Sequence, residues 1–185
     1  HEADIMCGYQ DAQMIVHGGL QHMSFAGKHP VDSGPPPTLT PIKSDLPFLL
    51  VTTGVERLSG SVHGPIAQRW MDGDRAVVEA IETITELGRQ AGEWAEKGDW
   101  QALADAMTEN HRLVAEMGGS GEPIDRLISL CRKHGAFAGK LAGAGLGGTV
   151  IALTDEPAYL ESMLRDEGYQ RFLRPEMVEG LRLDR

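Results

Sequence analysis

The stretch KLAGAGLGGTVIAL, residues 140–153, decides how the second half of this chain folds. Gly143, Gly145 and Gly148 have the spacing G-x-G-x-x-G, which in dinucleotide-binding proteins lies between a strand and a helix. Here residues 149–153 are short, rich in β-branched side chains and followed by Thr-Asp-Glu-Pro, a pattern that predicts a strand. A strand on each side of the glycines makes a hairpin, and this context argues against a nicotinamide-binding protein.

Glycines in such a turn allow positive φ angles and leave room for a ligand to approach the backbone. An ordinary glycine-rich hairpin accounts for this stretch equally well when it is taken alone. The rest of the sequence therefore has to decide whether the turn has a function.

Charge and composition exclude several classes of protein. The 185 residues carry a net charge of -10, which argues against nonspecific binding to nucleic acid or to an anionic membrane, because both need a basic face. No apolar run approaches the length of a membrane span. Cys7 and Cys131 stand far apart and outside any metal-binding spacing, so we expect two reduced thiols in a cytoplasmic protein.

Apolar spacing predicts the elements along the chain. Helices are expected at 9–16, 75–97, 103–117, 124–131 and 157–167, and strands at 20–25, 47–53, 136–141, 149–153 and, weakly, within 169–183. Residues 30–41 hold half of the prolines and predict an exposed loop. The order indicates an α+β fold with helices on one face of an antiparallel sheet.

Residues 140–148 resemble the third signature of the GHMP kinases, K-x-x-G-A-G-G-G-G followed by a strand, with Leu146 where glycine is commonest. Residues 110–114, 124–127 and 134–140 resemble the segments that precede that motif in the family. The segment TTGVER, residues 52–57, is similar to the family's strand-end T-G-x-x-R. Residues 8–13, GYQDAQ, resemble its G-x-x-D-Q segment, and the Gln-Asp pair is closer to the sugar-kinase branch, especially the heptose-phosphate kinases.

The resemblance implies a ferredoxin-like C-terminal kinase domain over residues 47–185, preceded by a Pro-rich linker at 30–46. Residues 1–29 would be the end of the N-terminal kinase domain, with a helix and a strand. The family's two upstream signatures are absent, including the loop that holds the ATP phosphates. We therefore expect a C-terminal part of such a kinase, either truncated or a natural fragment, whose partner is the missing N-terminal half.

The resemblance also assigns candidate site residues. Asp11 would face the substrate hydroxyl as the catalytic carboxylate; a solvated surface aspartate is the alternative. The substrate-binding candidates are Gly8, Gln10, Gly18, Gly19 and Arg57, and the positions expected beside the nucleotide are Gly143, Ala144, Gly145, Gly147 and Gly148. For the Gly18-Gly19 pair a helix stop is the alternative, and for Arg57 an exposed arginine without a specific role.

The function implied is ATP-dependent phosphorylation, with Mg²⁺, of a hydroxyl on a sugar or sugar phosphate. Mevalonate or phosphomevalonate is the alternative substrate, and a non-catalytic partner-binding domain is the alternative of another class. The isolated chain is expected to be inactive, and it could form a homodimer. The spacing of His17, His22 and His29 does not favour a metal site.

Overall fold

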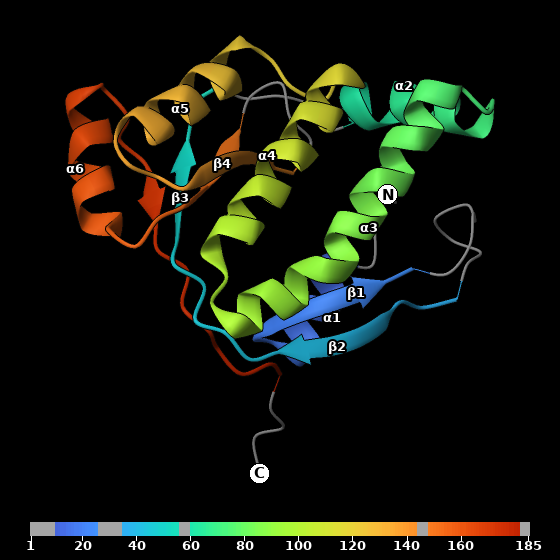
Figure 1. Cartoon of the computed structure of the whole chain (residues 1–185), viewed down its shortest axis with the longest axis horizontal. Coiled ribbons are helices and arrows are strands. Elements are labelled where there is room, and N and C mark those ends of the chain that lie inside the picture. The colour runs from blue at the N-terminus through green and yellow to red at the C-terminus, as the bar shows by residue number, and fades with distance from the viewer. Residues whose placement is uncertain (1–9, 26–34, 56–59, 144–147, 182–185) are drawn as a thin grey trace, which may run out of the picture. The chain divides into compact units, whose positions relative to one another are not determined.

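The computed structural model describes residues 10–25, 35–55, 60–143 and 148–181. The chain divides into two compact units, most of whose helices and strands are labelled in Figure 1. Unit 1 is formed by His1–Asp45 together with Glu176–Arg185, and unit 2 by Leu46–Pro175. Each unit is described by itself below.

Unit 1 contains a short helix and a two-stranded sheet. Helix α1 spans Gln10–His17, and strand β1, Leu20–Ser24, pairs antiparallel with β2, Thr38–Ile42. The prediction of an exposed loop over 30–41 is therefore wrong for residues 38–41. Pro41 lies opposite Gln21 in the sheet, which is tolerated because each strand of a two-stranded sheet has one free edge where no N–H is needed.

The sheet of unit 2 has the order β4-β5-β3-β6, with every pair antiparallel. Its strands are β3 (Phe48–Thr52), β4 (Ala138–Ala142), β5 (Thr149–Leu153) and β6 (Phe172–Leu173). With the helices between them they form the split β-α-β-β-α-β arrangement, so the predicted ferredoxin-like α+β fold is confirmed. The last strand is shorter than the predicted 169–183, because Pro175 follows closely and cannot donate to a ladder.

The helices in the described part of unit 2 are α2 (Gly60–Met71), α3 (Arg75–Lys97), α4 (Trp100–Glu116), α5 (Glu122–Lys133) and α6 (Pro157–Asp166). The carboxylate of Asp74 caps α3 by accepting from the N–H groups of Ala76 and Val77, and Gly98 ends the helix in the left-handed conformation. The sequence did not indicate α2, because glycines and Pro65 interrupt its helical pattern.

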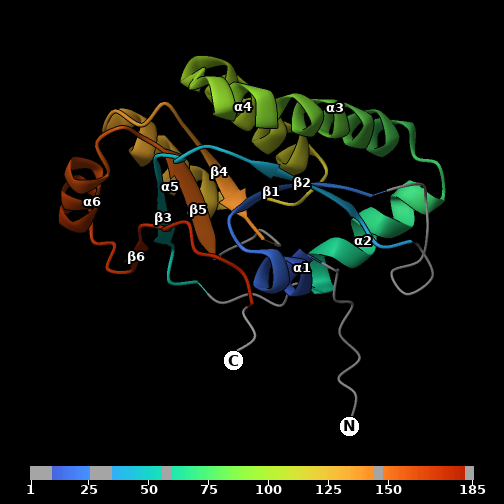
Figure 2. The same ribbon diagram turned by 90° about the horizontal axis from the view of Figure 1, so that it is seen from below.

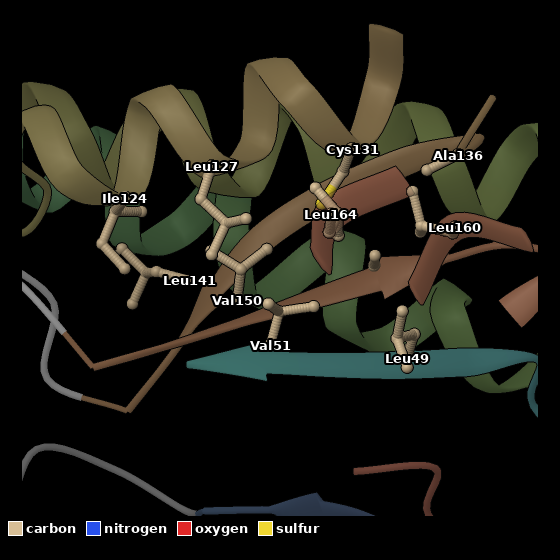
Figure 3. Packing of buried hydrophobic residues seen from close by; sticks show 11 residues of the cluster. Leu49, Val51, Ile124, Leu127, Cys131, Ala136, Leu141, Val150, Leu160 and Leu164 are labelled. Atoms are coloured by element: carbon tan, nitrogen blue, oxygen red, sulfur yellow. The ribbon is translucent and has the colours of Figure 1, made fainter. Parts of the chain in front are cut away.

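Helix α5 packs its apolar face on the sheet (Figure 3). Its buried side chains Ile124, Leu127 and Cys131 recur every three or four residues, which places them on one face of the helix. They meet β3, β4 and β5, and α6 closes the same face with Leu160 and Leu164. Burial raises the pKa of the Cys131 thiol to about 12, so this sulfur is part of the core and not a reactive group.

A second apolar cluster lies on the other face of the sheet. Successive strand residues alternate between faces, and Ala138 and Leu153 pack with Leu103, Ala104 and Met107 of α4. Helices α3 and α4 form a hairpin (Figures 1 and 2). Helices therefore cover both faces of the sheet, whereas the sequence pattern predicted helices on one face only.

Truncation of the central core residue tests this packing. Leu127 is fully buried and lies above Val150 (Figure 3). We expect Leu127→Ala to lower the free energy of unfolding by about 2–5 kcal/mol, because it leaves a cavity in a close-packed core. Met71→Ala, at a side chain that is 59% exposed, should change it by about 0.5 kcal/mol or less. Urea unfolding followed by tryptophan fluorescence reports on this unit, since Trp70, Trp94 and Trp100 all lie in it; equal losses in the two variants would contradict the assignment.

Candidate active-site turn and its surroundings

The described ends of the glycine turn have the backbone that only glycine adopts without strain. Gly143 follows β4 with φ of 77°, and Gly148 precedes β5 with φ of 92°. No atom of the described residues lies within 4 Å of a Cβ atom built on either residue. The left-handed conformation, and not crowding, therefore requires glycine here, and the backbone at both ends of the turn is open to an incoming group.

Thr53 fixes one end of the turn to the end of β3. Its N–H donates to the carbonyl of Gly148 at 2.7 Å, and its Oγ1 accepts from the Gly148 N–H at 3.1 Å. The same Gly148 N–H lies 3.1 Å from the carbonyl oxygen of Val55, and the N–H of Val55 donates to Thr53 Oγ1 at 3.2 Å. Two segments that both resemble kinase motifs are thus joined although they are 95 residues apart.

A cavity of about 590 Å³ opens beside this junction. Residues 52–55 form one wall, the loop 167–171 between α6 and β6 forms another, and Arg126 of α5 completes the lining. The N–H of Thr52 donates to the carbonyl of Arg171 at 3.0 Å, which joins the two walls. All the described residues that line this cavity belong to unit 2.

A polar cluster connects α4 with the start of α5. His111 Nε2 lies 3.2 Å from Asp125 Oδ1, and the hydroxyl of Ser120 donates to the same oxygen at 2.6 Å. His111 Nδ1 is buried and has no hydrogen-bond partner among the described residues. Burial lowers the pKa of His111; the bond to Asp125 opposes this shift, and the nearby charge of Lys140 adds to it.

Lys140, the first residue of the glycine motif, lies in largely apolar surroundings. It lines a space of about 130 Å³ with Asn110 and apolar residues of α3 and α4. Its Nζ donates to the carbonyl of Leu141 at 3.1 Å. Burial lowers the pKa of the ammonium group, since removal from water disfavours the charged form.

The predicted site residues divide between the two units. Gln10 and Asp11 are exposed in the first turn of α1, and Gly18 and Gly19 follow that helix with φ of 64° and 61°. A Cβ on Gly18 would lie 2.3 Å from the backbone nitrogen of Gly180, so this glycine is required by the close approach of the C-terminal segment. Its role and that of Gly19 in substrate binding stay predictions.

Gly8, Arg57, Ala144, Gly145 and Gly147 lie outside the described residues, as does Leu146. Asp11 belongs to unit 1 and the glycine turn to unit 2, so the hypothesis that they share a cleft remains a prediction. Within the described ranges, the side chains of His, Cys, Asp and Glu form no cluster of three or more that could hold a metal ion. No helix in those ranges is long and apolar enough to cross a membrane.

Sequence reasoning missed the cavity and the arginines that line it. Arg126 stands in an amphipathic helix and Arg171 in a loop, and no spacing relates them in the sequence. The TTG segment was recognised, but the bond from Thr53 to Gly148 follows only from the antiparallel pairing of β3 with β5.

Comparisons with known proteins agree with this architecture. The family described as GHMP kinases C terminal matches residues 93–166. Glucuronokinase 1 from Arabidopsis thaliana is 29% identical over 176 residues, which cover 91% of this chain and 48% of that protein. Mevalonate kinase from Aeropyrum pernix is 32% identical over 181 residues, covering 94% of this chain and 52% of that protein. The chain therefore spans about half the length of these relatives.

The crystal structure of L. major mevalonate kinase in complex with R-mevalonate superimposes with a TM-score of 0.67 and 24% identity, over 76% of this chain and 46% of that one. The split β-α-β-β-α-β sheet is a fold that this chain shares with that structure. The chain belongs to the GHMP kinase superfamily and corresponds to the C-terminal portion of its members.

The Thr53 junction gives a first prediction for this site. Thr53→Val removes the oxygen that accepts from Gly148 and Val55, and we expect a loss of stability of about 0.5–1.5 kcal/mol, the net value of one hydrogen bond. The Gly148 amide should also exchange faster with deuterium. Thr53→Ser keeps the oxygen and serves as the control. Unchanged exchange at Gly148 in the valine variant would show that the hydroxyl does not hold the turn.

His111 gives a prediction for pH. Its pKa is held below the ordinary 6.5 in the folded chain, so below that pH the unfolded chain binds protons more readily. The contribution of His111 to stability is therefore complete above pH 6.5 and is lost as the pH falls below it. We expect His111→Gln to weaken the pH dependence of the urea midpoint between pH 7 and about 5. His63→Gln, at an exposed residue of α2, is the control; a wild-type pH dependence in H111Q would refute the assignment.

Proposed function

We propose that this chain supplies the C-terminal part of an ATP-dependent kinase that phosphorylates a hydroxyl group of a sugar or sugar phosphate. The observation that carries the proposal is the glycine turn, whose end Gly148 is held by Thr53 at the end of β3. A glycine-rich turn that is anchored in this way suits a phosphoryl-transfer site, because catalysis of this reaction consists mainly of positioning and electrostatic stabilisation.

The backbone of the turn fits a nucleotide at its described ends. Gly143 and Gly148 leave open space where any other residue would place a Cβ atom, so a phosphate group has room to come close to their peptide groups. ATP would supply the phosphoryl group that is transferred. The described residues provide no cluster of carboxylates for Mg²⁺, so the metal would enter with the nucleotide and we assign it no ligand.

Asp11 is the proposed catalytic residue. A carboxylate beside the substrate hydroxyl orients it and accepts its proton. Asp11 lies in the first turn of α1 and its side chain is exposed, so a substrate has access to it. Arg57 is the proposed partner of an acidic substrate group, since a guanidinium binds carboxylate or phosphate through two parallel hydrogen bonds.

The substrate class is inferred from two observations. The Gln10-Asp11 pair is similar to the sugar-kinase branch, and the similarity to a glucuronokinase extends over 91% of the chain. Mevalonate or phosphomevalonate is the second candidate, favoured by the 32% identity with a mevalonate kinase. Residues from an upstream segment would complete the pocket and decide between them.

Exposed apolar side chains in unit 1 favour the proposal that an upstream segment packs against this unit. Helix α1 buries none of its residues, and Ile15 is 69% exposed. Leu181, whose N–H lies 3.1 Å from the carbonyl of Ile15, is 72% exposed, and Val178, three residues earlier in the chain, is 67% exposed. Large exposed apolar side chains favour burial against further protein. We propose that the N-terminal kinase domain covers them, and that the isolated chain pairs with a second copy instead. The free thiol of Cys131 accords with a cytoplasmic location.

Nucleotide and substrate titrations test this proposal. We expect Mg²⁺-ATP to bind the 185-residue chain weakly or not at all in calorimetry, because the loop that grips the phosphates lies upstream in the family. A longer protein that joins this chain to such a segment should phosphorylate a sugar acid or sugar phosphate. There, Asp11→Asn should lower kcat by about 10² or more, while Asp45→Asn leaves it unchanged.

Each part of this experiment can fail. Tight ATP binding by the chain alone would mean that the nucleotide site is misplaced. Unaltered kcat in Asp11→Asn would remove that residue from the mechanism. Binding of a protein partner together with a lack of kinase activity in the longer protein would favour the non-catalytic alternative.

A further inference from the structure

Most arginines in the described part of this acidic chain have side-chain partners. Most of those in the described ranges donate to a carboxylate of a nearby residue, and Arg132 donates to Thr108 and to the carbonyl of Phe137. The arginines paired with carboxylates are Arg69, Arg75, Arg89, Arg112, Arg165 and Arg174. Such pairing is expected where acidic side chains outnumber basic ones, 27 to 17.

Arg126 and Arg171 differ from all of these. Within the described part of the chain, neither guanidinium makes a hydrogen bond or an ion pair, and both line the same cavity of about 590 Å³. They come from different elements: Arg126 is the fifth residue of α5, and Arg171 is the residue before β6. Because both guanidinium groups line this cavity without a described partner, their positive charge is available to a ligand that enters it.

The other lining residues suit an anion. Tyr169 brings a phenolic hydroxyl, and its ring packs against the core beneath α5. Glu167 is the carboxylate in the lining, and its Oε1 already accepts from Lys133 Nζ at 3.0 Å and contacts His134 Nε2 at 3.3 Å. Its charge is therefore balanced within the chain and opposes an incoming anion only weakly.

We infer that this cavity binds the phosphate group of a small phosphorylated metabolite through Arg126 and Arg171. A phosphate monoester carries a charge of about -1.5 to -2 at neutral pH, which matches two guanidinium groups, whereas a carboxylate matches only one. The volume accommodates a ligand of sugar-phosphate size, because small-molecule sites typically measure about 300–1,000 Å³. The inference stands on this geometry and does not depend on the kinase assignment.

The site also touches the segment that anchors the glycine turn. Thr53 lines the cavity and holds Gly148 through its hydroxyl. A ligand bound in the cavity therefore contacts the same residues that fix the turn, and the Gly148 amide serves as a second reporter of binding.

The test is a titration of the 185-residue chain, without nucleotide, with glucose 6-phosphate, inorganic phosphate, glucuronate and glucose, followed by amide and arginine side-chain NMR signals. We expect saturable shifts at Gly54, Gly168 and the Nε–H groups of Arg126 and Arg171 with the two phosphate probes. Glucuronate should bind at least about tenfold more weakly, and glucose should cause no shift. Arg126→Gln/Arg171→Gln should lower the affinity for glucose 6-phosphate at least about tenfold, while Arg75→Gln, at an exposed pair on α3, should leave it unchanged.

Both substitutions lie at exposed side chains, and circular dichroism checks that the double variant is folded. Equal affinity in the folded double variant overturns the inference, as does glucose or glucuronate binding as tightly as glucose 6-phosphate. A wild-type titration without saturable shifts at these residues overturns it independently of any variant. Loss of kinase activity in a longer protein leaves these results unaffected, so the two proposals fail separately.

Discussion

The antiparallel pairing of β3 with β5 is the constraint on which unit 2 depends. It aligns Phe48 with Leu153 at one end and Thr52 with Thr149 at the other, and the bonds between Thr53 and Gly148 continue it past the strands. Thr53 and Gly148 are 95 residues apart. The entropic cost of closing a loop grows only slowly with the length of the chain between its ends. Burial of α5 and α6 against the paired strands offsets that cost, since apolar burial contributes about 25 cal/mol per Å².

The paired strands are closely packed, whereas the glycines at the ends of the turn that joins β4 to β5 leave space around the backbone. The strands are covered by helices on both faces, so their side chains are fixed by close packing. Gly143 and Gly148 follow and precede these strands, and no described atom lies within 4 Å of a Cβ atom built on either of them. Their peptide groups therefore lie next to packed strands, and a fixed position is the property that positioning catalysis requires.

Much of this arrangement was predictable because periodicity and turn chemistry are local signals. Helices α3, α4 and α5 have clear apolar stripes, and the strands that flank the glycines are bounded by turn residues. Helix α2 was missed because glycine and Pro65 hide its pattern, and β2 because proline-rich sequence predicts a loop. Both depend on tertiary context, which overrides propensity. The catalytic assignment of Asp11 came from resemblance alone, since a carboxylate on a short exposed helix has no distinguishing pattern.

The least predictable feature is the distribution of positive charge. Pairs such as Arg75 with Glu79 follow from spacing on one helix, and exposed pairs of this kind contribute little to stability. Arg126 and Arg171 line the same cavity only because the fold brings α5 and the residue before β6 to it. An acidic chain repels anions at long range, so affinity for a phosphate group has to come from a local concentration of unpaired guanidinium groups. The fold places that concentration next to Thr53, at the residue that also fixes the glycine turn.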